Sequence, residues 1–199
     1  IRVFLPEELE KLRVSPDKMS HFHEARKIEF KCVNKDSFSV AREMNEQKVL
    51  VLNLANPVHP GGGVRKGARA QEEDLCRKSS LLCSLESEEA SPYYIYNRER
   101  QSYLATDALM ITPQVEIIKD ERGRLLPEST IVSVLTCAAR MISHGGIPVS
   151  AKEYKDILYH RIEGMLLAAA YAGYENLVLG AFGCGAFGND ARLVSDLFY

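Results

Sequence analysis

Residues 48–77 read KVLVLNLANPVHPGGGVRKGARAQEEDLCR and carry the strongest structural signal in the chain. Residues 48–55 are a nearly continuous apolar run with β-branched side chains, which is typical of a strand buried on both faces and hence of parallel pairing. The prolines and glycines of residues 56–67 predict a loop, and the apolar spacing of residues 68–85 predicts a helix. A strand, a glycine-rich loop and a helix therefore follow one another.

The rest of the chain shows the same alternation of short apolar runs and helical patterns. Residues 120–123, DERG, predict a turn between two strands. Further strands are expected at residues 28–32, 104–111, 115–118, 130–136 and 177–182, and further helices at residues 36–44, at residues 152–171 and after Asn189 or Asp190. Helices interleaved with buried strands predict a layered α/β fold.

Composition fits one packed domain and excludes several classes of protein. The chain has 199 residues, of which 46% are hydrophobic and 26% charged. A net charge of −2 argues against general electrostatic binding to nucleic acid or an anionic membrane. No apolar run approaches the roughly 20 residues that span a bilayer.

Cysteine and histidine give no metal or disulfide pattern. Five cysteines, an odd number with no CxxC pair, argue against a disulfide framework and a zinc knuckle. They fit a reducing compartment, and we expect a cytoplasmic location. His21 and His23 could ligate a metal, but nothing near them in the sequence completes a set of ligands, so no metal site is expected.

Eight of the 13 glycines fall in two short segments, residues 61–67 and residues 180–188. Each segment follows a predicted strand and precedes a predicted helix, where glycine lets backbone N–H groups approach an anion. The pair indicates a phosphate or diphosphate site, although each could be only a tight turn. Residues 183–188 form a GxGxxG, but the chain ends before the acidic residue that a dinucleotide fold requires.

Gln71, Glu72 and Glu73 open the helix that follows the first glycine segment. Acidic residues in a first helical turn are often there only because the helix dipole stabilises them. Beside a phosphate site, however, such a carboxyl could act as a general acid. Neighbouring helical residues project about 100° apart, so Glu72 and Glu73 cannot be the facing acid and base of an ordinary glycosidase.

These residues resemble the microbial (bacterial-type) poly(ADP-ribose) glycohydrolases, whose signature is GGG, a short spacer and QEE. Here Gly61-Gly62-Gly63 is followed by seven residues and then by Gln71-Glu72-Glu73. Residues 177–190, LVLGAFGCGAFGND, are similar to the second phosphate loop of that family, and residues 112–125 to the segment between the loops.

The resemblance implies a three-layer α/β/α macrodomain with a mixed, largely parallel central sheet. It places the macrodomain-like catalytic domain at residues 36–199, with a C-terminus that we expect to be truncated. Residues 1–35 are then expected to be an N-terminal extension that packs on this domain. The implied reaction is hydrolysis of the ribose–ribose bond of poly(ADP-ribose), which needs no metal or nucleotide cofactor.

The resemblance also assigns roles to individual residues. It makes Glu73 the catalytic acid and Glu72 its neighbour on the ribose. Cys184 is expected to present its backbone to the ligand rather than to act as a nucleophile. The ligand-binding residues that the resemblance implies are Asn56, Gly62, Gly63, Val64, Gln71, Gly183, Cys184, Gly185, Ala186 and Phe187.

Three functions remain open from the sequence. The first is the polymer glycohydrolase, the second a hydrolase that removes single ADP-ribose units from protein or DNA, and the third a module that binds ADP-ribose without turnover. The intact Glu72-Glu73 pair argues against the third. The expected partner is poly(ADP-ribose) or an ADP-ribosylated macromolecule, with ADP-ribose as product, and the expected state is a monomer.

Overall fold

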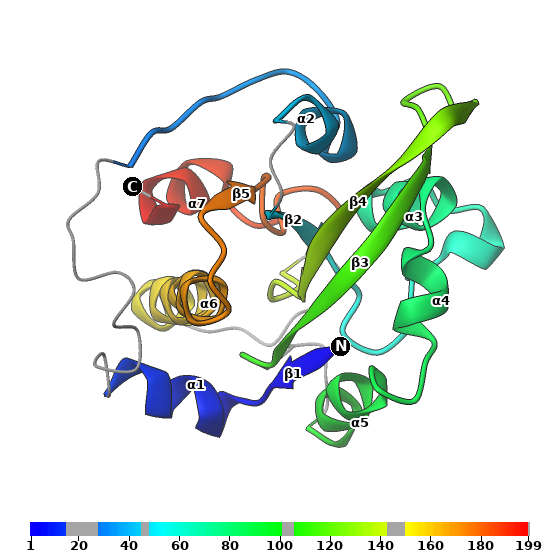
Figure 1. Ribbon diagram of the computed structural model, residues 1–199. Helices are drawn as coiled ribbons and strands as arrows, with labels where there is room; N and C mark the ends of the chain where they lie inside the picture. Colours follow the sequence, from blue (N-terminus) through cyan, green and yellow to red (C-terminus); the bar gives the residue numbers. More distant parts are fainter. Residues whose placement is uncertain (15–27, 45–47, 101–105, 143–149, 199) are drawn as a thin grey trace.

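The computed structural model describes residues 1–14, 28–44, 48–100, 106–142 and 150–198, which form three layers (Figure 1). A five-stranded sheet lies between two groups of helices. One face is covered by α2 (Ser37–Met44), α3 (Gln71–Lys78), α4 (Leu81–Leu85) and α5 (Ser91–Glu99), and the other by α1 (Pro6–Arg13), α6 (Ala151–Tyr171) and α7 (Ala191–Phe198). The predicted α/β/α arrangement is confirmed. None of the helices within these ranges has the length and apolarity to cross a membrane.

The sheet is mixed, in the order β1-β3-β4-β2-β5. Its strands are β1 (Arg2–Phe4), β2 (Val49–Leu54), β3 (Leu109–Lys119), β4 (Leu125–Cys137) and β5 (Asn176–Val178). Strand β2 is parallel to both β4 and β5, but β3 is antiparallel to β1 and β4. Strand β3 alone runs against the other four strands, because the tight turn at residues 120–123 makes β3 and β4 a hairpin. The expectation of a mixed, largely parallel sheet is therefore confirmed.

Strand β2 is buried on both faces, as its sequence predicts. Val49 and Val51 belong to the apolar cluster beneath α2 to α5, whereas Leu50 and Leu52 belong to the cluster beneath α1, α6 and α7. This alternation follows from the two-residue period of a strand. The carboxyl end of β2 leads into the loop that contains the first glycine segment.

Several predicted helix boundaries are confirmed by their capping contacts. The N–H of Ser39 donates to Oδ1 of Asp36 at the start of α2, at 3.1 Å. Asp190 accepts from the N–H groups of Arg192 and Leu193 at the start of α7. Helix α6 ends before Gly173, whose φ of +76° is the left-handed conformation typical of a helix stop.

The helix predicted at residues 68–85 is interrupted at its middle. The Ser79 hydroxyl donates to the carbonyl of Leu75 at 2.8 Å, and Ser79 forms an isolated bridge to Ile117 of β3. Pairing with β3 therefore separates α3 from α4. A contact with a strand distant in the sequence cannot be inferred from local helical spacing.

Other predicted elements differ from the structure. The strands expected at residues 104–111 and 115–118 are one strand, β3, with an irregularity between Thr112 and Val115; residues 104 and 105 lie outside the described part of the chain. The strand expected at residues 28–32 is wrong, since these residues are exposed and irregular. Helix α5 was not predicted, and β5 ends at Val178 rather than at residue 182.

Residues 1–14 are built into the same sheet and core as the rest of the chain. Strand β1 pairs with β3, and Phe4, Leu9 and Leu12 are buried in the cluster that includes α6. These residues supply an edge strand of the sheet and a helix that covers one of its faces.

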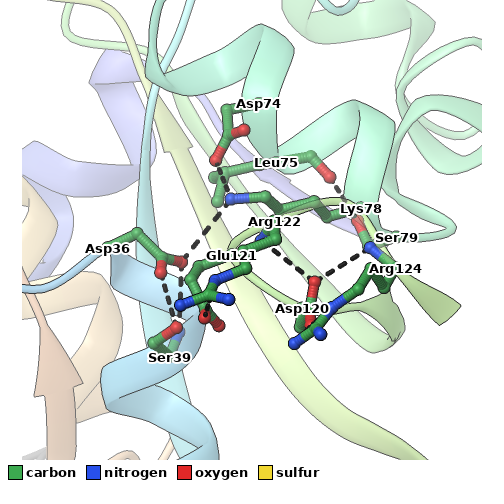
Figure 2. Close-up of polar contacts among 10 residues, drawn as sticks. All are labelled: Asp36, Ser39, Asp74, Leu75, Lys78, Ser79, Asp120, Glu121, Arg122 and Arg124. Carbon is green, nitrogen blue, oxygen red and sulfur yellow. Dashed lines mark hydrogen bonds and ion pairs between the residues drawn. The ribbon is translucent and has the colours of Figure 1, made fainter. Parts of the chain in front are cut away.

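An ion-pair network links α3 to the start of α2 (Figure 2). The ammonium group of Lys78 lies 2.6 Å from Asp74 Oδ2 and 3.9 Å from Asp36 Oδ1, and its side chain is only 7% exposed. Asp36 is also the cap of α2. The helix that begins with Gln71, Glu72 and Glu73 is thus fixed at its other end by a buried cation.

Candidate active site

A cleft of about 440 Å³ opens where the loops after β2, β4 and β5 meet. Its wall includes the second glycine segment, between β5 and α7, and the start of α3, which directly follows the first glycine segment. The residues that line it are Leu54, Asn56, Ala70, Gln71, Glu72, Glu73, Ala139, Ala181, Phe182, Gly183, Gly185, Ala186 and Phe187.

Glu73 is held by the first glycine segment and keeps one oxygen free for a ligand. The N–H of Gly63 donates to Glu73 Oε1 at 2.8 Å. The other oxygen, Oε2, is buried and has no hydrogen-bond partner among the described residues. A buried polar atom without a partner is costly, and at a cleft it is typical of a group that a ligand completes.

Gly62 lets the backbone approach both carboxylates. Its φ is +57°, and a Cβ placed there would lie 2.5 Å from Glu73 Oε1 and 3.0 Å from Glu72 Oε2. Any side chain would therefore displace the acidic pair in addition to straining the backbone.

Glu72 has different partners, although it belongs to the same helical turn. Its Oε2 accepts from the backbone N–H of Asn56 at 2.7 Å, and its Oε1 accepts from Asn53 Nδ2 at 3.3 Å. The Asn53 amide is buried and also donates to Thr136 on β4. Burial raises the pKa of Glu72 to about 8 despite these donors, so the carboxyl is largely protonated at neutral pH.

Gln71 fixes the start of α3 to the end of β2. Its Nε2 donates to the carbonyl of Leu52 at 2.7 Å, and its Oε1 accepts from the N–H of Leu54 at 2.8 Å. Both the oxygen and the nitrogen of its amide therefore form hydrogen bonds with the β2 backbone, although the residue borders the cleft. This contact sets where the two following glutamates emerge.

Asn56 begins the loop after β2. Its Oδ1 accepts from the N–H groups of Val58 and His59, each at 2.9 Å. Within the described part of the chain its amide nitrogen has no hydrogen-bond partner. The side chain is thereby oriented by its oxygen and left with two donors at the cleft.

The second glycine segment is positioned by Asn189 and Tyr154. Asn189 Nδ2 donates to the carbonyls of Arg140 and Gly183 at 2.8 and 3.0 Å. The hydroxyl of Tyr154 donates to Asn189 Oδ1 at 3.2 Å and accepts from the N–H of Asp190. Gly183 has a φ of +72°, and a Cβ there would collide with Ala139 and Asn189. The loop is thus fixed to the end of β4 and to α6.

Cys184 lies within this loop and has few features of a nucleophile. Its thiol points to the carbonyl of Phe182 at 3.6 Å, and burial raises its pKa above the ordinary value. A nucleophilic cysteine requires the opposite shift, toward the thiolate.

The structure brings together most of the residues that the sequence singles out, but not all. Gly62, Gly63, Val64 and Cys184 do not line the cleft; Gly63 instead binds Glu73. The cleft also includes residues that sequence reasoning missed, namely Leu54, Ala70, Ala139, Ala181 and Phe182. Ala139 follows the predicted strand at residues 130–136. The end of that strand was the one feature of the sequence that could have indicated Ala139 as a cleft residue.

Within the described ranges, no three His, Cys, Asp or Glu side chains lie together as metal ligands. His21 and His23, the candidates from the sequence, lie outside these ranges.

Comparison with known proteins places this geometry in a family. Residues 4–120 match the family described as microbial-type PARG (poly(ADP-ribose) glycohydrolase), catalytic domain. The match starts well before residue 36, in agreement with the role of β1 and α1 in the core. No curated protein matches the sequence.

Solved structures give a match over nearly the whole chain. A poly(ADP-ribose) glycohydrolase from Deinococcus radiodurans in complex with ADP-ribose is 36% identical, with a TM-score of 0.87; the match covers 99% of this chain and 78% of that one. The enzyme from Thermomonospora curvata bound to the inhibitor ADP-HPD is 34% identical, with a TM-score of 0.86, over 99% of this chain and 70% of that one. With its two glycine loops and paired glutamates at one cleft, this chain belongs to the microbial-type poly(ADP-ribose) glycohydrolase family.

Proposed function

We propose that this protein is a poly(ADP-ribose) glycohydrolase that hydrolyses the ribose–ribose O-glycosidic bond and releases ADP-ribose. Family membership over nearly the whole chain supports this activity. The observation that carries the assignment of the catalytic group is the Glu73 carboxyl: one oxygen is fixed by Gly63, and the other is buried at the cleft without a partner among the described residues.

In the proposed reaction, Glu73 first donates its proton to the oxygen that leaves with the rest of the polymer. The glycosidic bond breaks as positive charge develops on the ribose, in an oxocarbenium-like transition state. The Glu73 carboxylate then takes a proton from a water molecule, which attacks the ribose carbon. Glu73 is thus protonated again, and ADP-ribose carries the new hydroxyl group.

The remaining residues bind and orient the substrate. The diphosphate is proposed to lie along the loop at residues 183–187, where backbone N–H groups can contact it without a metal. The free amide donors of Asn56 suit hydroxyl groups of the ribose. Glu72, which its raised pKa keeps largely neutral, can hydrogen-bond the same ribose without adding a negative charge beside Glu73.

The substitution Glu73→Gln tests the proposal. It keeps the size of the side chain and an acceptor for the Gly63 N–H, but removes the transferable proton. We expect release of ADP-ribose from polymer to fall by at least about a hundredfold, the lower range for loss of a general acid. Binding of ADP-ribose, measured by calorimetry, should be largely unchanged.

Glu116→Gln, on β3 and away from the cleft lining, is the matched control and should retain full activity. Turnover retained by Glu73→Gln would remove Glu73 from the acid role. A panel of polymer, mono-ADP-ribosylated peptide and mono-ADP-ribosylated DNA separates the alternatives. Cleavage of the last two without the polymer would favour a mono-ADP-ribosyl hydrolase, and ADP-ribose binding with no cleavage a recognition module. A monomeric state and a cytoplasmic location stay predictions.

A further inference from the structure

The segment between the two halves of the signature is exposed and positively charged. Residues 65–69, which we call the basic loop, contain Arg65, Lys66 and Arg69 and no acidic residue. Every residue of the basic loop is exposed. This concentration of positive charge contrasts with the net charge of −2 of the whole chain.

The basic loop is wound around the glycine that holds Glu73. The N–H groups of Lys66 and Ala68 both donate to the carbonyl of Gly63, at 2.9 and 3.1 Å, while the N–H of Gly63 binds Glu73 Oε1. Ala70, which directly follows the basic loop, lines the cleft. The exposed cations are therefore carried by the segment that also fixes the carboxyl proposed to protonate the leaving oxygen.

The three cations differ in what already neutralises them. Arg65 forms an ion pair with Glu86 at 2.8 Å, which anchors the loop to the end of α4. Arg77 donates to the carbonyl of Ala68 and anchors the other side. Lys66 and Arg69 have no ion-pair partner among the residues that the structure describes. Of the nearby acids, Glu72 and Glu73 are buried and Asp74 pairs with Lys78.

We propose that Lys66 and Arg69 form a second anion subsite, which binds the diphosphate of the polymer unit beyond the scissile bond. The inference rests on the proposed function, because it concerns the part of the substrate that departs with the leaving oxygen. The departing part begins with the oxygen that Glu73 is proposed to protonate. The ADP-ribose unit that carries this oxygen also carries a diphosphate. A lysine and an arginine that have no ion-pair partner in the described ranges suit a phosphate group, and the arginine can bind it with two hydrogen bonds.

The subsite explains how a chain of negative net charge could prefer a polyanion. Exposed charges attract each other over roughly 8–10 Å at physiological salt, so only local cations matter to the substrate. Two such contacts at about 0.7 kcal/mol each correspond to about a tenfold change in affinity. We therefore expect the basic loop to affect binding of the polymer, not the chemical step.

The test compares two substrates that differ only beyond the scissile bond. Poly(ADP-ribose) carries the extra diphosphate, whereas a nitrophenyl glycoside of ADP-ribose does not. For the double variant Lys66→Gln/Arg69→Gln we expect KM for the polymer to rise roughly tenfold with kcat unchanged. The kcat/KM for the nitrophenyl glycoside should stay at the wild-type value, and the salt dependence of KM for the polymer should become weaker.

Lys11→Gln removes one exposed positive charge on α1, as each single variant of the loop does, and is the control. It should change the kinetic constants for neither substrate. A fall in kcat on the polymer with KM unchanged would mean that the loop only supports Glu73, and no loss on the polymer would mean that the cations do not contact it; either result overturns the inference. The single variants Lys66→Gln and Arg69→Gln, each expected to show a smaller KM effect, serve if the double variant does not fold. Failure of the wild-type protein to cleave either substrate would instead overturn the proposed function.

Discussion

Glu72 and Glu73 are adjacent in one helical turn, yet their surroundings give them different properties. Glu73 is fixed at one oxygen by Gly63, and Glu72 accepts hydrogen bonds at both oxygens from Asn53 and Asn56. Their different directions follow from the 100° rotation between neighbouring helical residues. The partners, however, come from β2 and from the loop that follows it, so they depend on how α3 packs on the sheet.

The close approach of Gly62 to this pair makes a specific prediction for Gly62→Ala. The left-handed backbone costs about 1–2 kcal/mol for a residue with a Cβ, and the new methyl group would also displace Glu73. We therefore expect a loss of stability together with a loss of at least tenfold in kcat. Chemical denaturation and turnover of polymer measure the two effects.

Gly123→Ala is the matched comparison for that variant. Its φ of +78° is also left-handed, but no atom of the described residues lies within 4 Å of a Cβ placed there. It should lose similar stability and keep full activity. If both variants kept their activity, the Gly62 contact would have no part in placing Glu73.

The raised pKa of Glu72 predicts how stability depends on pH. Below about pH 4.5 the carboxyl is protonated in both the folded and the unfolded protein, so it contributes no pH dependence. Between about 4.5 and 8 the unfolded chain releases the proton and the folded protein keeps it, so stability falls as pH rises. The total change is at most about 5 kcal/mol, and it levels off above pH 8.

Glu72→Gln removes this titration while keeping an acceptor for the Asn56 N–H. The stability of the variant relative to the wild type should therefore increase between pH 5 and pH 8, as measured by urea denaturation at each pH. A difference that stays constant over this range would contradict the raised pKa.

Helices and strands were predictable from the sequence where the local pattern agrees with the packing. The burial of β2 on both faces, the cap of α2 at Asp36 and the length of α6 all follow from short-range patterns. The division of α3 from α4 did not, because Ser79 pairs with β3, almost 40 residues away in the sequence. Helix α5 was missed because its strongly buried residues, Tyr93 and Tyr94, do not make an extended apolar stripe.

The ion pairs of Lys78 hold α3 in place and make a further prediction. Lys78→Met removes a buried cation and leaves Asp74 and Asp36 without it (Figure 2). The two carboxylates remain partly exposed to water, so we expect a loss of about 1–3 kcal/mol in the free energy of unfolding. The kcat should be unchanged under conditions where the variant is folded, because Lys78 lies at the end of α3 opposite the glutamates.

Lys35→Met compares the loss of an exposed ion pair with the loss of the buried ion pair of Lys78. Lys35 contacts Glu43 at 2.6 Å, as close as Lys78 to Asp74, but its side chain is 48% exposed. It should cost less than about 1 kcal/mol, as expected of a surface ion pair. Equal losses in the two variants would show that burial does not account for the effect of Lys78.

For the molecule as a whole, the family could be identified from two short segments of sequence. The part that residues 1–14 play in the fold could not. The glycine and QEE strings are local, so the sequence indicated an anion site and a candidate acid from spacing alone. The place of residues 1–14 in the sheet and core could not be predicted from their own sequence. It depends on the pairing of β1 with β3 and on the packing of α1 on α6, which are both contacts with distant segments.

The sequence alone established the layered α/β fold, the two glycine loops and the acidic pair, since each depends on the spacing of neighbouring residues. Only the folded structure shows that the Gln71 amide hydrogen-bonds the backbone of β2 and that Glu72 is buried against Asn53. It also shows that Glu73 retains an oxygen without a hydrogen-bond partner among the described residues. These properties arise from contacts between segments far apart in the chain. Hydrogen bonding and burial, which set the pKa and the available donors, are properties of those contacts rather than of any single stretch of sequence.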